Sequence, residues 1–127
     1  MEKTKTLSVV VSVYNEEAAL EEFYKTAEPV FADLPWDYEL VFVNDGSADG
    51  SDRILRQFSA RNPKVRVIEF SRNFGHEAAM IAGIDYSRGD GIVWIQGMLL
   101  PGGEIRHHQK LLAILRLEII AKLRIEP

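Results

Sequence analysis

Polar side chains that could bind a ligand stand directly after three short apolar runs of this chain. They are Asn15 and Glu16 after the first run, Asp45 after the second, and Arg72 and Asn73 after the third. Carboxylates and amides can hydrogen-bond the N–H and hydroxyl groups of a base and a ribose, whereas an arginine and free helix N–H groups suit a diphosphate. The combination predicts a cleft for a nucleotide diphosphate, with Asp45 as the first candidate binding residue.

Each of these residues also has a simpler structural interpretation. Asp45 followed by Gly46 could form only an Asx-type turn, in which the glycine allows φ > 0. Glu16 and Glu17 could be acids in the first turn of a helix, where negative charge is favoured. Arg72 and the asparagine after it could be solvated loop residues. The residue spacing alone leaves both interpretations open.

Strands and helices are expected to alternate along the part of the chain that carries these side chains. The apolar runs predict strands at residues 7–14, 38–43, 65–70 and 92–95. Helical periodicity and breaker residues predict helices at residues 17–31, 52–62 and 76–87. This order favours a Rossmann-like three-layer α/β/α fold with a mainly parallel sheet and the first strand at its centre. Ligands of open α/β sheets bind outside the carboxyl ends of the strands, where the polar residues lie.

Two further expectations concern the core and the helix ends. Phe70, Phe74 and Trp94 are most simply interpreted as core residues, because large aromatic side chains are usually buried. Asp49 and Ser51 each offer an oxygen that could cap the second helix.

Length and composition limit the classes of protein to which this chain can belong. Its 127 residues, 46% hydrophobic and 27% charged, suit one globular domain. The net charge of -4 argues against nucleic acid as the main partner. Without cysteine the chain has no disulfide or thiolate metal site. It shows no signal peptide and no apolar run of the roughly 20 residues that cross a bilayer, so we expect a cytoplasmic protein.

The turn after the first predicted strand lacks the glycines that dinucleotide enzymes need. It reads VYNEEAAL, without G-x-G-x-x-G or a P-loop. A dinucleotide-dependent oxidoreductase is therefore disfavoured. His107 and His108 are adjacent and would point to different sides of a helix, so a metal-binding pair is improbable.

Three ordered segments resemble glycosyltransferase family 2, whose members have the GT-A fold. They read SVVVSVYNEEAAL, ELVFVNDGSADGS and VIEFSRNFGHEAAMIAGIDYSRGDGIVWI. Within the family, the SRNFG-x-E-A-A stretch is most similar to bacterial polyprenyl-phosphate sugar transferases and dolichyl-phosphate mannose synthase-like proteins. The resemblance covers residues 7–95, which would form the N-terminal half of a GT-A fold.

The resemblance implies a hexosyltransferase that takes part in cell-wall or lipid-linked glycan biosynthesis in bacteria. It would transfer a sugar from a UDP- or GDP-linked donor to a polyprenyl phosphate with inversion, at the inner face of the membrane in the full-length family. By position, Tyr14 and Glu16 would line the nucleotide pocket, and Asp45 would bond the base or ribose. Arg72 and Asn73 would lie near the diphosphate. The nucleotide-sugar-binding residues expected from the resemblance are Tyr14, Asn15, Glu16, Asp45, Gly46, Ser47, Arg72 and Asn73.

The sequence departs from the family directly after the fourth predicted strand. The family places an Asp-x-Asp motif there to hold Mg²⁺ or Mn²⁺, whereas this chain has Gln96, Gly97 and Met98. An amide, a residue without a side chain and a thioether cannot replace two hard anionic ligands. The resemblance therefore implies a divalent cation for which these positions supply no ligands, and we expect the chain alone to be impaired or inactive.

Residues 96–127 form the second part of the expected domain organisation, after a nucleotide-sugar-binding domain at residues 1–95. They contain strong helix formers, but their apolar residues scatter around the helical wheel. We interpret this tail as an altered end of the family sequence, through a frameshift or a truncation. A tail of this kind could join copies of the chain in a homo-oligomer. The alternative interpretation is a catalytically dead module that binds a nucleotide or a partner protein.

Overall fold

The computed structural model describes residues 5–96 of the chain. Strands and helices alternate in the order β1 (Thr6–Val13), α1 (Glu17–Ala32), β2 (Asp37–Asn44), α2 (Ser51–Arg61), β3 (Val65–Glu69), α3 (His76–Tyr86) and β4 (Gly91–Gln96). Each predicted element is present, with both ends within one residue of the expected position. The tail predicted for residues 96–127 lies outside the described residues, except that Gln96 ends β4.

The four strands form one parallel sheet in the order β3-β2-β1-β4. The central position predicted for the first strand is therefore confirmed. From their second residue onward β1 and β2 are buried at every position, as expected for strands covered on both faces. In the register, Val13 of β1 lies beside Asn44 of β2, and Asn44 lies beside Glu69 of β3. The carboxyl ends of these strands consequently meet at one edge.

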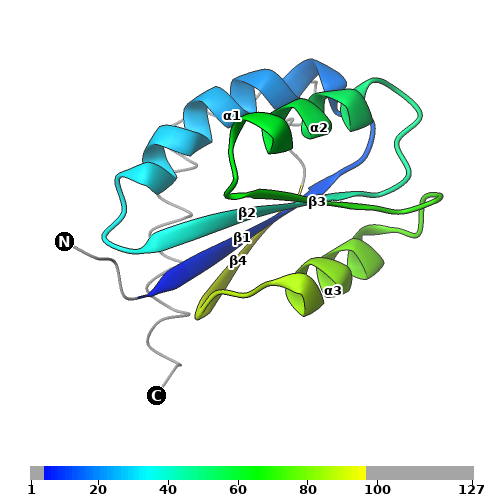
Figure 1. Ribbon diagram of the computed structural model, residues 1–127. Helices are drawn as coiled ribbons and strands as arrows, with labels where there is room; N and C mark the ends of the chain where they lie inside the picture. Colours follow the sequence, from blue (N-terminus) through cyan, green and yellow to red (C-terminus); the bar gives the residue numbers. More distant parts are fainter. Residues whose placement is uncertain (1–4, 97–127) are drawn as a thin grey trace.

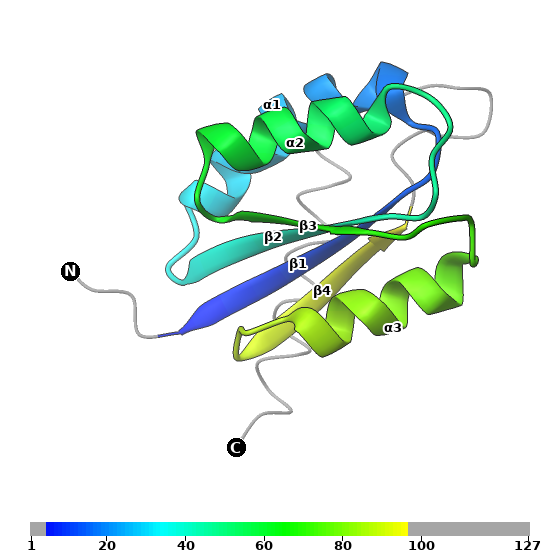
Figure 2. The same ribbon diagram turned by 45° about the vertical axis from the view of Figure 1, so that its right-hand side comes forward.

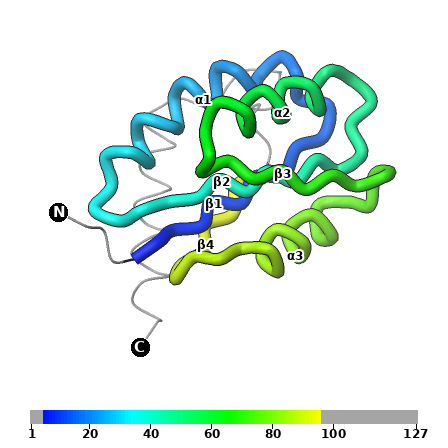
Figure 3. The backbone as a smooth tube through the Cα atoms, in the orientation of Figure 1, coloured from blue at the N-terminus to red at the C-terminus, as the bar shows by residue number. Residues whose placement is uncertain are grey.

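Helices cover both faces of the sheet, which confirms the three-layer α/β/α arrangement. α1 and α2 lie side by side over one face, and α3 lies against the other (Figures 1 and 2). The larger core, between the sheet and the helix pair, contains the rings of Phe31, Phe42 and Phe58. The smaller core, on the α3 side, contains Val10 and Ala79. The tube in Figure 3 shows how each helix carries the chain back to the start of the next strand.

Small residues allow α3 to lie very close to the sheet. Ala79 and Gly83 are its buried residues, whereas Ile81 and Ile84 are 55% and 40% exposed. A Cβ placed on Gly83 would lie only 2.2 Å from the Cγ1 atom of Val10 in β1. The close approach of α3 to β1 therefore depends on a glycine at this position. Within residues 5–96, no helix combines the length and hydrophobicity required to span a membrane.

Candidate functional site

The loops that follow β1, β2 and β3 gather at the carboxyl edge of the sheet. In Figures 1 and 2 this edge lies on the right, where the strands pass into α1, α2 and α3. All eight predicted site residues belong to these three loops. The structure therefore brings the predicted residues to one end of the fold.

Hydrogen bonds join the first loop to the second. The Asn15 N–H donates to Ser47 Oγ at 3.0 Å, and the Ala48 N–H donates to Asn15 Oδ1 at 2.7 Å. The Glu16 N–H donates to Ser51 Oγ at 3.1 Å. Asn15 has φ of 50°, a left-handed conformation that asparagine tolerates better than most residues. This backbone turn lets Asn15 bond the second loop through both its main chain and its side chain.

Asp49 adds a further connection between the same two loops. Its Oδ1 accepts from the Ser51 N–H at 2.9 Å, and its Oδ2 accepts from the Glu17 N–H at 3.2 Å. Partial burial raises the pKa of Asp49, but hydrogen bonds from Ser51 and from the Glu17 N–H outweigh it and lower the pKa overall. Asp49 thus bonds the first N–H of α2. The cap predicted for Ser51 is wrong: α2 has no side-chain cap at Gly50, and the Ser51 hydroxyl bonds Glu16 instead.

Asp45 joins the second loop to the third. Its side chain is almost entirely buried, and the residue is only 2% exposed. Oδ1 accepts from the Phe74 N–H at 2.8 Å, while Oδ2 accepts from the Gly75 N–H and from Asn73 Nδ2, both at 3.1 Å. Negative charge is favoured here, directly before the N-terminus of α3. A carboxylate offers about four lone-pair sites, and donors within residues 5–96 fill three of them, leaving one on Oδ1 that these residues do not fill.

Gly46 lets the third loop lie directly against the second. Its φ is 70°, and a Cβ at this position would lie 2.2 Å from the carbonyl carbon of Arg72 and 2.3 Å from the nitrogen of Asn73. No other residue type fits without moving that backbone. The predicted residues Asp45 and Gly46 are thereby in direct contact with the predicted residues Arg72 and Asn73.

Several side chains at this edge remain open to solvent. Tyr14 is 44% exposed, and the side chains of Asn15, Arg72 and Asn73 are exposed as well. The predicted core position of Phe74 is wrong, because this side chain is 49% exposed. Its ring packs edge-on against Phe70 at 5.4 Å and lies 4.7 Å from the guanidinium carbon of Arg72.

Phe74 is the residue at this edge that sequence reasoning missed. Hydrophobicity indicates burial, but a loop has no periodicity that would show on which side its residues point. The available signal is its position directly after Arg72 and Asn73. Phe74 and Arg72 together present an aromatic ring and a cation to solvent.

The chemistry of the available side chains does not fit the divalent cation that the family resemblance implies. Among the described residues there is no group of three or more His, Asp or Glu side chains that could hold a metal ion. At the expected metal position, Gln96 ends β4, and Gly97 and Met98 lie outside the described residues. By residue type these three positions supply no anionic ligand.

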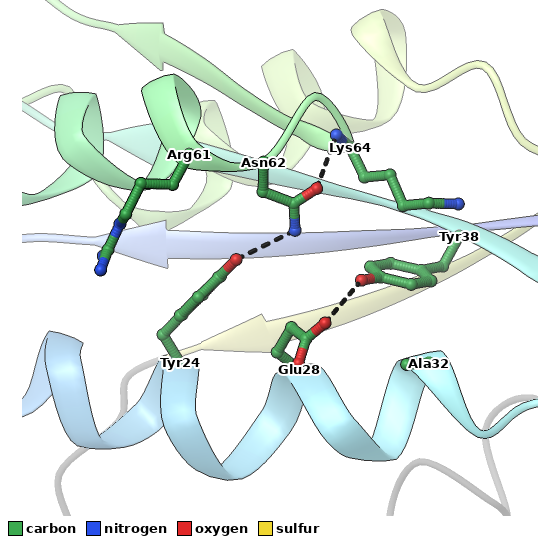
Figure 4. Close-up of a pocket in the computed structure, with 7 residues that line it drawn as sticks. All are labelled: Tyr24, Glu28, Ala32, Tyr38, Arg61, Asn62 and Lys64. Carbon is green, nitrogen blue, oxygen red and sulfur yellow. Dashed lines mark hydrogen bonds between the residues drawn. The ribbon is translucent and has the colours of Figure 1, made fainter.

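A cavity of about 420 Å³ lies away from the predicted site, near the amino ends of β2 and β3. Figure 4 shows its lining residues, which are Tyr24, Glu28, Ala32, Tyr38, Arg61, Asn62 and Lys64. Hydrogen bonds among them include Asn62 Nδ2 to the Tyr24 hydroxyl at 2.9 Å. None of the predicted nucleotide-binding residues belongs to this cavity.

Comparison with protein families and known proteins identifies relatives of this chain. The model of the family "Glycosyl transferase family 2" matches residues 8–97. An uncharacterized glycosyltransferase, YkcC, from Bacillus subtilis is 50% identical over 98 residues, which are 77% of this chain and 30% of that protein. The bactoprenol glucosyl transferase of Shigella phage SfV is 41% identical over 102 residues, which are 80% of this chain and 33% of that protein.

Solved structures share the fold. Staphylococcus aureus TarS 1-349 in complex with UDP-GlcNAc has a TM-score of 0.62 at 22% identity, over 72% of this chain and 26% of that one. The mannosyltransferase PcManGT from Pyrobaculum calidifontis, in complex with GDP-Man and Mn²⁺, has a TM-score of 0.60 at 24% identity, over 71% of this chain and 26% of that one. The described sheet and helices are thus those of GT-A glycosyltransferases.

The matches cover most of this chain but only part of each relative. It spans about a third of the length of these two sequence relatives. The family match covers the three strand-end loops and the strands that position them. The chain therefore belongs to glycosyl transferase family 2.

Proposed function

We propose that this chain binds a nucleotide-diphosphate sugar at the carboxyl edge of its sheet. The observation that carries the proposal is the mutual bonding of the three strand-end loops, which fixes polar side chains at one edge of the sheet. Asn15 is held by the second loop, and Asn73 is held by Asp45. Arg72 contributes a cation beside them. A preorganised set of this kind binds with little further loss of side-chain freedom.

Each group at this edge suits a different part of the ligand. Tyr14 and Glu16 would line the pocket for the nucleoside, and Arg72 and Asn73 would bond the diphosphate oxygens. Asp45 is only 2% exposed, so it could meet the base through no more than the acceptor position that the described donors leave on Oδ1, and this position would match the single N–H on the pairing edge of uracil. Guanine presents two adjacent donors there and would need two free acceptor positions. This difference favours a UDP-linked donor.

The reaction we propose for the whole protein is sugar transfer to a polyprenyl phosphate. The relative from phage SfV is named for action on bactoprenol, which supports a lipid acceptor. A phosphate oxygen of the acceptor would form a bond to the anomeric carbon while the bond from that carbon to the nucleotide diphosphate breaks, with inversion. Arg72 would stabilise the negative charge of the departing diphosphate.

A second candidate function is a binding module without catalytic activity. The residue types at Gln96, Gly97 and Met98 favour it, because they cannot hold a divalent cation. Loss of an ion that stabilises the leaving group would remove several kcal/mol of transition-state stabilisation, and each 1.36 kcal/mol is about tenfold in rate. We accordingly infer that this chain retains nucleotide binding better than turnover.

Calorimetric titration of the full chain with UDP and with GDP, each with and without Mn²⁺, tests the proposal. We expect UDP to bind more tightly than GDP and Mn²⁺ to change the affinity little. Arg72→Ala should weaken UDP binding at least tenfold, because a charged hydrogen-bond partner contributes about 1.5–3 kcal/mol. Arg61→Ala is the matched control, since Arg61 lines the cavity in Figure 4, and should leave the affinity unchanged. Absence of binding to either nucleotide would refute the proposed function.

A further inference from the structure

Within residues 5–96, the buried carboxylate of Asp45 receives its hydrogen bonds from a single loop. The donors are the N–H groups of Phe74 and Gly75 and the side-chain amide of Asn73. The same amide also donates to the Asp45 carbonyl oxygen at 3.2 Å. A charge removed from water requires such donors, and the donors in turn lose their acceptor if the charge is removed.

We infer that Asp45 has a positioning role in nucleotide binding, in addition to any contact with the base. It holds residues 71–75 so that Arg72 and Asn73 are presented to the diphosphate. The inference rests on the proposed nucleotide site, because it concerns how that site is held in shape. We call the set of bonds between Asp45 and residues 73–75 the Asp45 latch.

The neighbouring glycine explains why the latch can control Arg72. Gly46 lies directly beneath the Arg72–Asn73 peptide, so the third loop is held between that glycine and the Asp45 carboxylate. Arg72 directly precedes Asn73, whose side chain is a latch donor, and only Asn73 separates it from the latch donor on the Phe74 backbone. When the carboxylate is absent, the N–H groups of Phe74 and Gly75 lose their acceptor, and the Asn73 amide keeps only its weaker bond to the Asp45 carbonyl oxygen.

The latch and a base contact have different consequences for two related ligands. Uridine contains the base and ribose, whereas UDP also contains the diphosphate that Arg72 and Asn73 would bond. Loss of a base contact would lower the affinity for both ligands by the same factor. Loss of the latch would lower the affinity for UDP alone, because only the diphosphate of UDP contacts the displaced loop.

Calorimetric titrations of the full chain with uridine and UDP test the inference through Asp45→Asn, which preserves side-chain size. The amide it introduces would place an NH₂ group against the N–H donors of the third loop. We expect the UDP affinity to fall at least tenfold more than the uridine affinity. Equal losses for the two ligands would overturn the positioning role.

Asp49→Asn provides the matched control. Asp49 also bonds two backbone N–H groups, but these belong to Glu17 and Ser51, in the loops that do not carry Arg72. Its loss should weaken uridine and UDP by the same factor. A selective loss of UDP binding in this control would overturn the assignment of the effect to the third loop.

A double-mutant cycle and a spectroscopic measurement complete the test. The effects of Asp45→Asn and Arg72→Ala on UDP affinity should be strongly non-additive, because both act through Arg72; additive effects would contradict the latch. In the free chain, Asp45→Asn should shift the amide proton resonances of Phe74 and Gly75, and unchanged resonances would overturn the latch directly. If the wild-type chain binds neither ligand, the proposed function and the diphosphate role both fail, while the resonances still decide whether the latch exists.

Discussion

At the residue scale, one glycine beside the Asp45 latch, Gly46, and one within it, Gly75, tolerate an added side chain differently. Gly46 has φ of 70° and no space for a Cβ, whereas Gly75 has φ of 101° and nothing within 4 Å of the Cβ position. We expect Gly75→Ala to lower the free energy of unfolding by roughly 1–3 kcal/mol, the cost of a positive-φ, extended conformation that is adopted almost only by glycine. Gly46→Ala should cost more, because it also displaces the backbone of Arg72 and Asn73.

Urea denaturation of both variants, followed by extrapolation to zero denaturant, measures this difference. Gly75→Ala serves as the control for backbone strain without a steric clash. Equal losses in the two variants would show that the close approach of the third loop to Gly46 has no energetic weight.

Residue types predicted where the site lies better than how it is held together. Asp45, Arg72 and Asn73 follow apolar strands, and parallel strand ends must share an edge, so their proximity followed from the sequence. The hydrogen-bond partners of Asp45 could not be predicted, because the backbone N–H groups of Phe74 and Gly75 are present whatever the residue type. The exposure of Phe74 was also unpredictable, since nothing in a single sequence fixes the direction of a loop side chain.

At the element scale, the glycine in α3 determines how closely this helix approaches β1. Replacing a mid-helix glycine by alanine normally stabilises a helix by about 1 kcal/mol. Here the added Cβ would lie 2.2 Å from Cγ1 of Val10, which is fully buried and stiff at χ1. We therefore expect Gly83→Ala to lower the free energy of unfolding by roughly 1–3 kcal/mol, the usual cost of overpacking.

A double-mutant cycle with Val10→Ala checks the cause. Val10→Ala alone creates a cavity and should destabilise the protein, but it also removes the methyl group that the new Cβ would meet. The combined variant should therefore be more stable than the sum of the two single losses predicts. If the two losses of stability are additive, the contact with Val10 is not the reason why a glycine is needed at position 83.

The bounds of the elements were predictable because two independent signals coincide. Each apolar run is followed directly by a polar or glycine-bearing turn, as at Val43 to Gly46. The packing of α3 was less predictable, because small residues face the sheet while Ile81 and Ile84 face outward. Hydrophobicity favours the opposite orientation, and the closeness of β1 decides the outcome.

At the scale of the whole molecule, Glu39 joins three strands and the segment after α3. Its carboxylate accepts from Ser8 Oγ at 2.5 Å, from Arg66 Nη1 at 2.9 Å and from the Arg88 N–H at 2.6 Å. Burial raises the pKa of Glu39, but these hydrogen bonds outweigh it and lower the pKa below the ordinary value of 4.5. The stabilisation is therefore complete above about pH 4.5 and disappears as the pH falls through the lower pKa of the folded state.

Glu39→Gln should lower the free energy of unfolding at pH 7 by about 1–3 kcal/mol, because it weakens a buried network of donors. The difference from the wild type should shrink below pH 4.5, where the wild-type carboxylate becomes protonated. Denaturation at a series of pH values measures this difference in stability.

Glu69→Gln is the control. Glu69 pairs with Arg56 at the surface, and loss of this ion pair should lower the free energy of unfolding by less than about 1 kcal/mol. A pH-independent difference for Glu39→Gln would contradict the assignment.

The bonds between the strand-end loops connect distant parts of the chain, and we expect the site to form late in folding. The Ala48–Asn15 and Phe74–Asp45 bonds join residues 33 and 29 positions apart, and such long-range contacts carry a larger loop-closure cost than local ones. A chain with paired strands and undocked loops would have no place for a nucleotide. A nucleotide that binds here would therefore select completely folded chains, and at 100 times its dissociation constant it would stabilise them by about 2.7 kcal/mol. The fraction of chains that is folded would therefore rise with the concentration of the nucleotide-sugar donor.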